Sequence, residues 1–265
     1  MKILQGKTDI GRRRKVNQDT FAVLSPSADL ALCVVCDGMG GAVGGAEASR
    51  LACDTFCASV SGLLEEIVQI SGAVCSDAEA CADLQGRLTR CIPDALSDAA
   101  EAANAAVYAA AESDTMLQGM GTTLVALLCW GDFACAVNVG DSRLYAVTDT
   151  EIRQLSHDHS YVQYLIDMGK LTVEEAKQST NRNIITRAVG TGPSIDCDLI
   201  EIPAELVGSS TFLLCSDGLS SMVEDGQMAE IIRGEGSAEE KTDALVNRAN
   251  EAGGTDNITA VLCRR

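Results

Sequence analysis

Short apolar runs lie toward the two ends of the chain, and a long alanine-rich region separates the two groups. Each run stops at a glycine, an aspartate or another turn-forming residue, which is typical of β-strands. The runs that we interpret as strands are 20–25, 30–37, 121–130, 133–142, 143–149, 210–218 and 257–263.

Helices are expected between the strand groups and near the C-terminal end, where alanine, leucine and glutamate dominate. Pro93-Asp94 is a suitable N-terminal start for a helical segment. The segment 71–86 is interpreted as a surface connection or a short helix. Ser237 and Glu240 form a capping-box pattern, and Gly253 follows the end of that helix. The expected helices cover 47–70, 84–112 and 237–254.

Three consecutive runs predict an antiparallel meander, with turns at Gly131-Asp132 and near Asp141. Long helices between groups of strands favour layers of helix packed on sheet. The predicted class is therefore α+β, a sandwich of sheets covered by helices. The chain has only four prolines and no linker-like stretch, so we expect residues 1–265 to form a single domain.

Composition narrows the classes of partner. Lysine and arginine number 20 and aspartate and glutamate 38, which gives a net charge of −18. Such an acidic chain repels nucleic acid and anionic membranes, so we expect neither as a partner. The opening "MKILQGKTDIG" becomes polar after Leu4, and no run approaches the ~18 apolar residues of a membrane helix. The expected compartment is therefore the cytoplasm.

Cys33 and Cys36 precede Asp37 and leave two interpretations open: a CxxC metal or redox site, or a buried strand. Positions three apart in a strand face opposite sides, and the cysteine spacings match no standard paired zinc site. Most of the twelve cysteines lie in apolar or alanine-rich runs. A free thiol behaves there as a small hydrophobic side chain, so we favour reduced structural cysteines.

Aspartates recur where the predicted strands begin or end. Taken alone, each one is an ordinary turn former or cap. Four of the five lie beside glycines that allow close backbone approach, namely Gly38, Gly140, Gly218 and Gly254. If the strands end together, the carboxylates converge and repel one another unless a cation lies between them. An oxygen-only ligand set suits Mg²⁺ or Mn²⁺. The aspartates are Asp19, Asp37, Asp141, Asp217 and Asp256.

A basic cluster, Arg12 to Lys15, stands out against this acidic background, and Arg14 lies five residues before Asp19. Arginine binds phosphate oxygens bidentately and keeps its charge. The other three cations are expected to form a solvated turn. One arginine beside a carboxylate–metal centre predicts metal-assisted hydrolysis of a phosphate ester.

Eight segments in one order make the pattern specific. The chain resembles the metal-dependent serine/threonine protein phosphatases of type 2C, in their bacterial stand-alone form, from Thr8 to Leu262. The matching segments are "TDIGRRRKVNQD", "VVCDGMGGAVGGAEAS", "GMGTTLVALL", "VNVGDSRLY", "LSHDHSYVQYLIDMGKLTVEEA", "NRNIITRAVG", "FLLCSDGL" and "GTDNITAVL".

The resemblance implies a four-layer sandwich, in which two antiparallel sheets are flanked by pairs of antiparallel helices. It also implies that two Mn²⁺ or Mg²⁺ ions bind tightly and a third binds weakly. Asp37 would bridge two ions, and the Gly38 carbonyl would bind one of them. Asp217 and Asp256 would complete the second ion's ligands, and Asp141 with Asp217 would serve the third. Asp19 would hold metal-bound waters.

The same resemblance implies that Arg14 grips the substrate phosphate while a metal-bridging hydroxide attacks phosphorus without a covalent phosphoenzyme. A mobile flap is implied over about 157–190. Phosphorylated proteins are the implied substrates, and a cognate serine/threonine kinase is the implied partner.

The chain departs from the family pattern at three positions and in one length. Gln18 stands where an acidic residue is common, and Ala42 where histidine is frequent. Met39 stands where some members carry a proposed general acid, which leaves that role unassigned. The segment 63–83 is long and has no expected role. Because no metal-binding aspartate is missing, we expect an active enzyme. The alternatives are a non-catalytic phosphoprotein-binding module of the same fold and a hydrolase of small phosphate esters.

Overall fold

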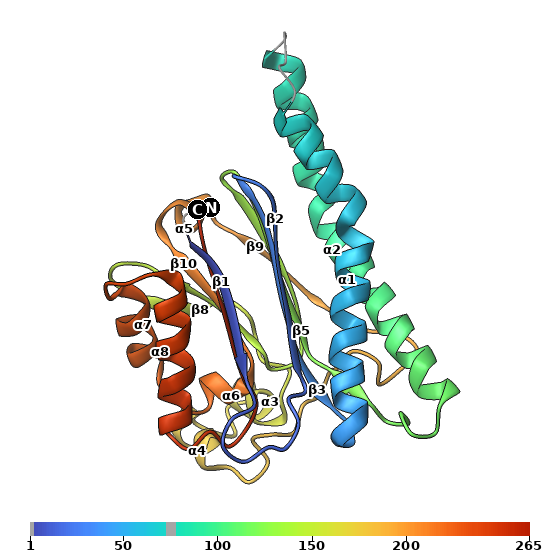
Figure 1. The fold of residues 1–265 in the computed structure, drawn as a ribbon, viewed down its shortest axis with the longest axis vertical. Coiled ribbons are helices and arrows are strands. Elements are labelled where there is room, and N and C mark those ends of the chain that lie inside the picture. The colour runs from blue at the N-terminus through green and yellow to red at the C-terminus, as the bar shows by residue number, and fades with distance from the viewer. Residues whose placement is uncertain (1–2, 73–77) are drawn as a thin grey trace.

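A computed structural model describes residues 3–72 and 78–265, in which two antiparallel sheets pack face to face (Figure 1). The first sheet consists, in spatial order, of β1 (Ile3–Asp9), β11 (Ile258–Arg264), β10 (Thr211–Cys215), β7 (Arg143–Val147) and β8 (Ile152–Gln154). The second consists of β2 (Asp19–Ser27), β3 (Leu30–Met39), β5 (Leu124–Trp130), β6 (Phe133–Val139) and β9 (Asp198–Ile202), and β4 (Gly121–Thr122) pairs with β3.

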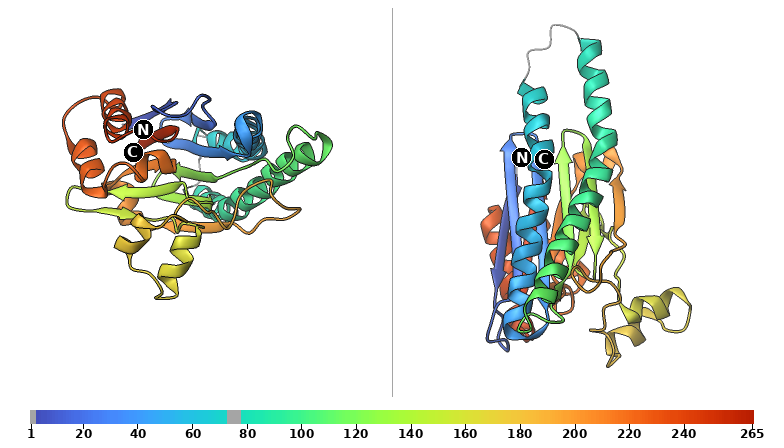
Figure 2. Two further views of the ribbon diagram at one scale, coloured as in Figure 1. Left: turned by 90° about the horizontal axis from the view of Figure 1, so that it is seen from below. Right: turned by 90° about the vertical axis from the view of Figure 1, so that its right-hand side faces the viewer.

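A pair of helices covers the outer face of each sheet and completes four layers, as Figures 1 and 2 show. The second sheet carries α1 (Gly41–Gly72) and α2 (Ala78–Ser113), and the first carries α7 (Asp225–Arg233) and α8 (Ala238–Glu251). The predicted α+β class and four-layer sandwich are confirmed. Shorter helices lie in the connections: α3 (Tyr161–Asp167), α4 (Val173–Gln178), α5 (Ala204–Ser209) and α6 (Asp217–Ser220).

The central strands read as continuous apolar runs because both of their faces are covered. On β3, Cys36 packs beneath α1 and α2, whereas Cys33 packs between the two sheets. The two thiols therefore face opposite sides, as predicted. A hydrogen bond with Cys263 and burial raise the pKa of Cys33, which keeps it a neutral thiol. Every cysteine whose side chain the structure describes is free.

The predicted three-strand meander is wrong in its last strand. β5 and β6 pair through the turn at Gly131, as expected. β7, however, pairs with β10 in the opposite sheet. Gly140, at φ +108°, lets the chain leave β6 and cross between the sheets just before Asp141. The crossing places Asp141 at the end of the sandwich, between the two layers.

The helical hairpin is longer than predicted, and Pro93 lies inside α2 instead of starting it. The helix continues through the proline because Leu88, Ile92 and Leu96 on its inner face are buried. Their packing outweighs the one backbone hydrogen bond that proline removes. Most of the predicted connection 71–86 is therefore helical. Its residues 73–77 lie outside the described part of the chain, as does the side chain of Ala42.

Other elements have weaker sequence signals. The strands β1, β8 and β9 and the helices α3 to α7 were not predicted, since they are short or only half-buried, and α6 begins within the predicted strand 210–218. The C-terminal helix α8 is confirmed, with Ser237 and Glu240 exchanging both capping-box hydrogen bonds. Among the described residues, no helix combines the length and apolar character needed to cross a bilayer.

Candidate functional site

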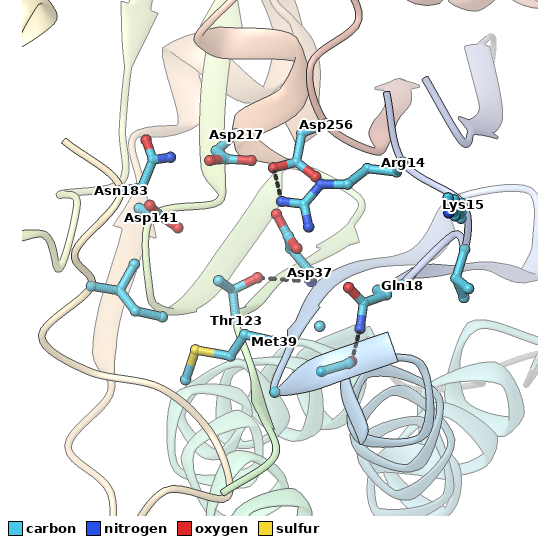
Figure 3. A pocket seen from close by; sticks show the side chains of 15 residues that line it. Arg14, Lys15, Gln18, Asp37, Met39, Thr123, Asp141, Asn183, Asp217 and Asp256 are labelled. Carbon is cyan, nitrogen blue, oxygen red and sulfur yellow. Dashed lines mark hydrogen bonds and ion pairs between the residues drawn. The ribbon is translucent and has the colours of Figure 1, made fainter. Parts of the chain in front are cut away.

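Strand ends meet at one end of the sandwich and bring the predicted aspartates together. Asp19 begins β2 and lies directly opposite Asp37 of β3. Asp141 follows β6, Asp217 follows β10 and Asp256 precedes β11. Figure 3 shows the carboxylates of Asp37, Asp141, Asp217 and Asp256 directed toward a common space, which we call the aspartate pocket.

The aspartate pocket has a volume of about 400 Å³. Asp19 does not line it and is almost fully buried. Arg12 and Arg13 are exposed and do not line it either, whereas Arg14 does. Besides the aspartates and Arg14, the side chains around it include Lys15, Gln18, Met39, Thr123, Asn183 and Ile185.

Hydroxyl groups of neighbouring residues hold the Asp37 backbone in place. The Asp37 N–H donates to Thr123 Oγ1 at 2.9 Å, and the hydroxyl of Thr122 donates to the Asp37 carbonyl at 2.9 Å. Thr123 Oγ1 also lies 2.7 Å from the hydroxyl of Ser142, which follows Asp141. These contacts connect the peptides that carry Asp37 and Asp141, and they leave both carboxylates directed into the pocket.

Gly38 is required by packing. A Cβ at this position would collide with the carbonyl oxygens of Gly45 and Gln18. The first turn of α1 therefore packs directly on the end of β3 only because residue 38 has no side chain.

Asp19 is anchored from the opposite sheet. Its Oδ2 accepts hydrogen bonds from Ser216 at 2.8 Å and from Thr259 at 2.6 Å. Its Oδ1 is buried and has no hydrogen-bond partner among the described residues, as is also true of Asp217 Oδ1. A buried carboxylate oxygen without a partner is costly, so these atoms indicate that a ligand belongs here.

Arg14 reaches into the pocket from the loop before β2. One guanidinium nitrogen donates to Asp256 Oδ2 at 2.6 Å, and this contact raises the pKa of Arg14. Asn257 holds the loop: its side-chain amide donates to the carbonyls of Ile10 and Val16 and accepts from the Gln18 N–H. The residue after Asp256 thus fixes the segment that carries Arg14.

Burial and mutual repulsion raise the pKa of the clustered carboxyls. Burial contributes most, and it raises the pKa of Asp19 to about 7 and of Asp141 to about 8. The pKa of Asp37 is raised by burial, then by Asp19 and Asp217. Burial, and then the negative charge of Asp256, raise the pKa of Asp217. Each carboxyl therefore resists ionisation unless positive charge enters the pocket.

The donor set fits a hard divalent cation. The pocket presents carboxylate oxygens, and no cysteine or histidine is among its described lining residues. Among the described residues, no three or more of the carboxylates are drawn together closely enough to hold an ion as they stand, and Asp256 contacts Arg14. The pocket nevertheless suits cations. A bound cation would contact the partnerless carboxylate oxygens and would lower the raised pKa values of the carboxyls.

A buried histidine supports the turn that carries Asp141. The backbone N–H of Gly140 donates to the ring nitrogen Nδ1 of His159 at 3.1 Å. The backbone N–H of His159 donates in return to the Gly140 carbonyl at 2.9 Å. His159 Nε2 lies 3.1 Å from Asp198 Oδ2. Since Nδ1 accepts, the proton of the neutral ring is on Nε2, facing Asp198. Burial lowers the pKa of His159, which favours this neutral form.

Comparison with known proteins identifies the family. A family model described as Protein phosphatase 2C matches residues 8–263. The serine/threonine phosphatase stp of Listeria innocua is 34% identical over 259 residues, which cover 98% of this chain and 94% of that protein. The chain belongs to the protein phosphatase 2C family.

Solved structures of the protein phosphatase 2C family resemble this fold. The Streptococcus agalactiae serine/threonine phosphatase superposes with a TM-score of 0.81 at 31% identity, covering 98% of this chain and 97% of that one. The catalytic domain of the phosphatase PstP, solved in complex with two manganese ions, has a TM-score of 0.73 at 31% identity, with the same coverage.

Two departures from the family pattern have structural consequences. Gln18 donates from its amide to the carbonyl of Gly41 at 2.6 Å, a hydrogen bond that a carboxylate could not donate. Met39 lies at the pocket edge, and its thioether has no proton to donate (Figure 3).

Several supporting residues were missed by sequence reasoning. Asn183 lines the pocket from the segment after α4, and Thr123, Asn257 and His159 hold its backbone. All four lie inside matched segments of the sequence, namely "NRNIITRAVG", "GMGTTLVALL", "GTDNITAVL" and "LSHDHSYVQYLIDMGKLTVEEA". Only Asn257 had a local signal, because it is a polar residue directly after the candidate Asp256.

Proposed function

We propose that this protein phosphatase 2C hydrolyses phosphoserine and phosphothreonine monoesters on proteins, with Mn²⁺ or Mg²⁺ as cofactor. The observation that carries the proposal is the convergence of four aspartates and Arg14 on one pocket. The names of the related phosphatases support the substrate class. The manganese-bound PstP structure supports the cofactor.

The cation-binding residues proposed are those of the aspartate pocket. Asp37, the Gly38 carbonyl, Asp217 and Asp256 would hold two ions, and Asp141 with Asp217 would hold a third. Asp19 would act from beside the pocket through its partnerless oxygen. When bound, the cations supply positive charge and Lewis acidity for the attack of water on phosphorus.

The chain's own contribution is to bind and orient the phosphate. Arg14 remains cationic because contact with Asp256 raises its pKa. Among the described contacts, Asp256 occupies one guanidinium nitrogen, so the other N–H groups would be available to phosphate oxygens. No cysteine or histidine nucleophile lines the pocket within the described chain, which favours direct attack by water. Because Met39 cannot donate a proton, the proton for the leaving alkoxide would come from a water or from another residue of the pocket.

Turnover of a phosphothreonine peptide with Mn²⁺ tests the proposal. Hydrolysis should require the cation and should be abolished in Asp37→Asn and in Asp217→Asn. Robust turnover in a chelator, or in either variant, contradicts it. Stoichiometric peptide binding without turnover would instead indicate a non-catalytic module, and faster hydrolysis of nucleotides would indicate a small-ester hydrolase.

The wider assignments are also proposals. Residues 1–265 would form one catalytic domain, in which 157–190, called the flap from here on, borders the site. The cytoplasm is the proposed compartment, because the described cysteines are free thiols. A cognate serine/threonine kinase would supply the phosphorylated substrates, since a phosphatase of this class removes what such a kinase adds.

A further inference from the structure

A run of four cations, Arg12 to Lys15, borders the aspartate pocket, and we call it the basic turn. All four residues are exposed, and the last two line the pocket. Figure 3 shows Arg14 and Lys15 on the opposite side of the pocket from Asp141 and Asn183. Because the whole chain has a net charge of −18, the basic turn gives one edge of the pocket a local charge of the opposite sign.

The backbone of the basic turn is fixed against the loop before β11, although its side chains are exposed. The Arg12 N–H donates to the Gly254 carbonyl at 2.7 Å. Gly11 has φ +78°, and a Cβ there would collide with the carbonyl oxygen of Asp256. Asn257 holds the segment on both sides of the turn, as described above. The four cations therefore start from fixed backbone positions, which lowers the entropy cost of binding a ligand.

Three cations of the basic turn have no anionic partner in the described part of the protein. Arg14 contacts Asp256. No carboxylate of the described residues forms an ion pair with Arg12, Arg13 or Lys15. A cation that is held in place and has no partner can bind an anion from solution without first breaking an ion pair.

From this geometry we propose that the basic turn binds a second anionic group of the substrate protein, beside the phosphate that is hydrolysed. Arg14 serves the phosphate in the pocket, so the second group contacts Lys15 at the pocket edge and Arg12 or Arg13 outside it. The group is a carboxylate or a phosphate, because both present oxygens to guanidinium and ammonium donors. The inference rests on the proposed phosphatase function and specifies its substrates as phosphoproteins with a second acidic or phosphorylated residue nearby.

The distances allow one substrate segment to reach both places. Arg12 lies two residues from Arg14, so their Cα atoms are at most about 7 Å apart. An extended substrate chain crosses the same distance in two or three residues, since each residue advances it by about 3.3 Å. Because the basic turn borders the pocket on one side only, the preference should apply to one flank of the phosphorylated residue.

A glutamate scan tests the proposal. In a serine-rich phosphothreonine peptide, one glutamate is moved position by position through both flanks, and kcat/KM is measured with Mn²⁺. Glutamate should raise kcat/KM about tenfold within a few residues on one flank, because two or three exposed ion pairs add their modest contributions. The gain should disappear at about 1 M salt, which screens exposed charges. A profile that is flat, or equal on both flanks, or a gain that persists unchanged in salt, overturns the proposal.

Double variants assign the preference to the basic turn. In Arg12→Gln with Arg13→Gln, the ratio of kcat/KM for the best glutamate peptide to that for the neutral peptide should fall from about tenfold to about twofold. Replacing the same two residues by lysine keeps both charges and should retain most of the preference, which separates charge from folding. The matched control is Arg87→Gln with Arg90→Gln, because these arginines are exposed on α2 and do not line the pocket. The control should keep the tenfold ratio.

A further peptide separates the two sources of the anion. A non-hydrolysable phosphonate analogue of phosphoserine replaces the glutamate at its best position. If the ligand is a second phosphate, the analogue should lower KM about threefold below that of the glutamate peptide, because it carries more charge and three acceptor oxygens. Equal KM values would assign the site to carboxylates. Either result supports the basic turn, whereas no effect of either group overturns it.

The outcomes separate the two levels of the proposal. If neither the peptides nor p-nitrophenyl phosphate are hydrolysed, the proposed function fails. If all peptides are hydrolysed without preference for a second anion, only the assignment of the basic turn fails. An equal loss of preference in the Arg87 and Arg90 control would also refute it, because the effect would then belong to the net charge of the protein.

Discussion

The aspartate pocket and the flap lie next to each other but differ in how deeply their residues are buried. The pocket is built on strands such as β3, whose residues Leu30–Cys36 have no exposed surface. Within the flap, α3 (Tyr161–Asp167) contains no buried residue, and α4 (Val173–Gln178) buries only Ala176. Residues that must hold a fixed geometry lie on the packed sheets, whereas the flap helices are weakly packed.

The largest expected effect is on activity, at the pocket. Arg14→Ala should lower kcat/KM for a phosphothreonine peptide about 100-fold, because a preorganised charge on the phosphate is lost. Arg14→Lys should restore only part of the lost kcat/KM, since the lysine ammonium group lacks the planar pair of N–H donors of a guanidinium. Steady-state kinetics measures both, and the side chain's 47% exposure implies little change in stability. If Arg14→Ala kept the wild-type kcat/KM, Arg14 would not be a phosphate-binding residue of the pocket.

The next effect concerns pH and metal in the pocket. The folded-state pKa is raised to about 7 for Asp19 and about 8 for Asp141, from a usual 3.8. These carboxyls hold protons more tightly in the folded state, so their contribution to stability is present below about pH 4 and is lost as pH rises through about 7–8. The metal-free protein should therefore lose Tm through this window.

Mn²⁺ should reverse that loss, raising Tm more at about pH 8 than at about pH 5, because the cation binds the ionised form. Differential scanning fluorimetry at several pH values measures this. Asp141→Asn, which keeps the shape but cannot titrate, should flatten the pH dependence of the metal-free protein. A metal-free Tm that rises steadily from about pH 5 to about pH 8 would contradict the prediction.

A smaller effect tests the support beneath the pocket. Thr123→Val should cost about 1–3 kcal/mol in the free energy of unfolding, because the buried Asp37 N–H loses its acceptor. Denaturant unfolding measures the change. Thr115→Val, at an exposed position after α2, is the control and should be near neutral. Equal stability of the two variants would show that the hydroxyl contacts do not hold the strand ends.

The smallest effect is expected at the flap. Lys177→Met removes the contact with Glu224, an exposed pair, and should change the free energy of unfolding by less than about 0.5 kcal/mol. Limited proteolysis within the flap should nevertheless become faster, because the pair connects α4 to the body. A global destabilisation as large as that of Thr123→Val would show that flap and sheets unfold as one unit.

Much of the architecture was predictable from local pattern. The period of two in a strand placed Cys33 and Cys36 on opposite faces, and the capping box placed the start of α8. Aspartates at strand ends followed by turn residues pointed to one cluster. Convergence within each sheet was predictable if paired strands end together, whereas the meeting of the two sheets' ends at one pocket was not.

The partners of those aspartates were decided only by the tertiary structure. The sequence does not show that β7 joins the opposite sheet, because a single turn at Gly140 sets that direction. It does not show that Asn257 holds the Arg14 loop across 241 positions, as it does through Val16. Local patterns determine which residues end strands, whereas contacts between distant segments determine what those ends face.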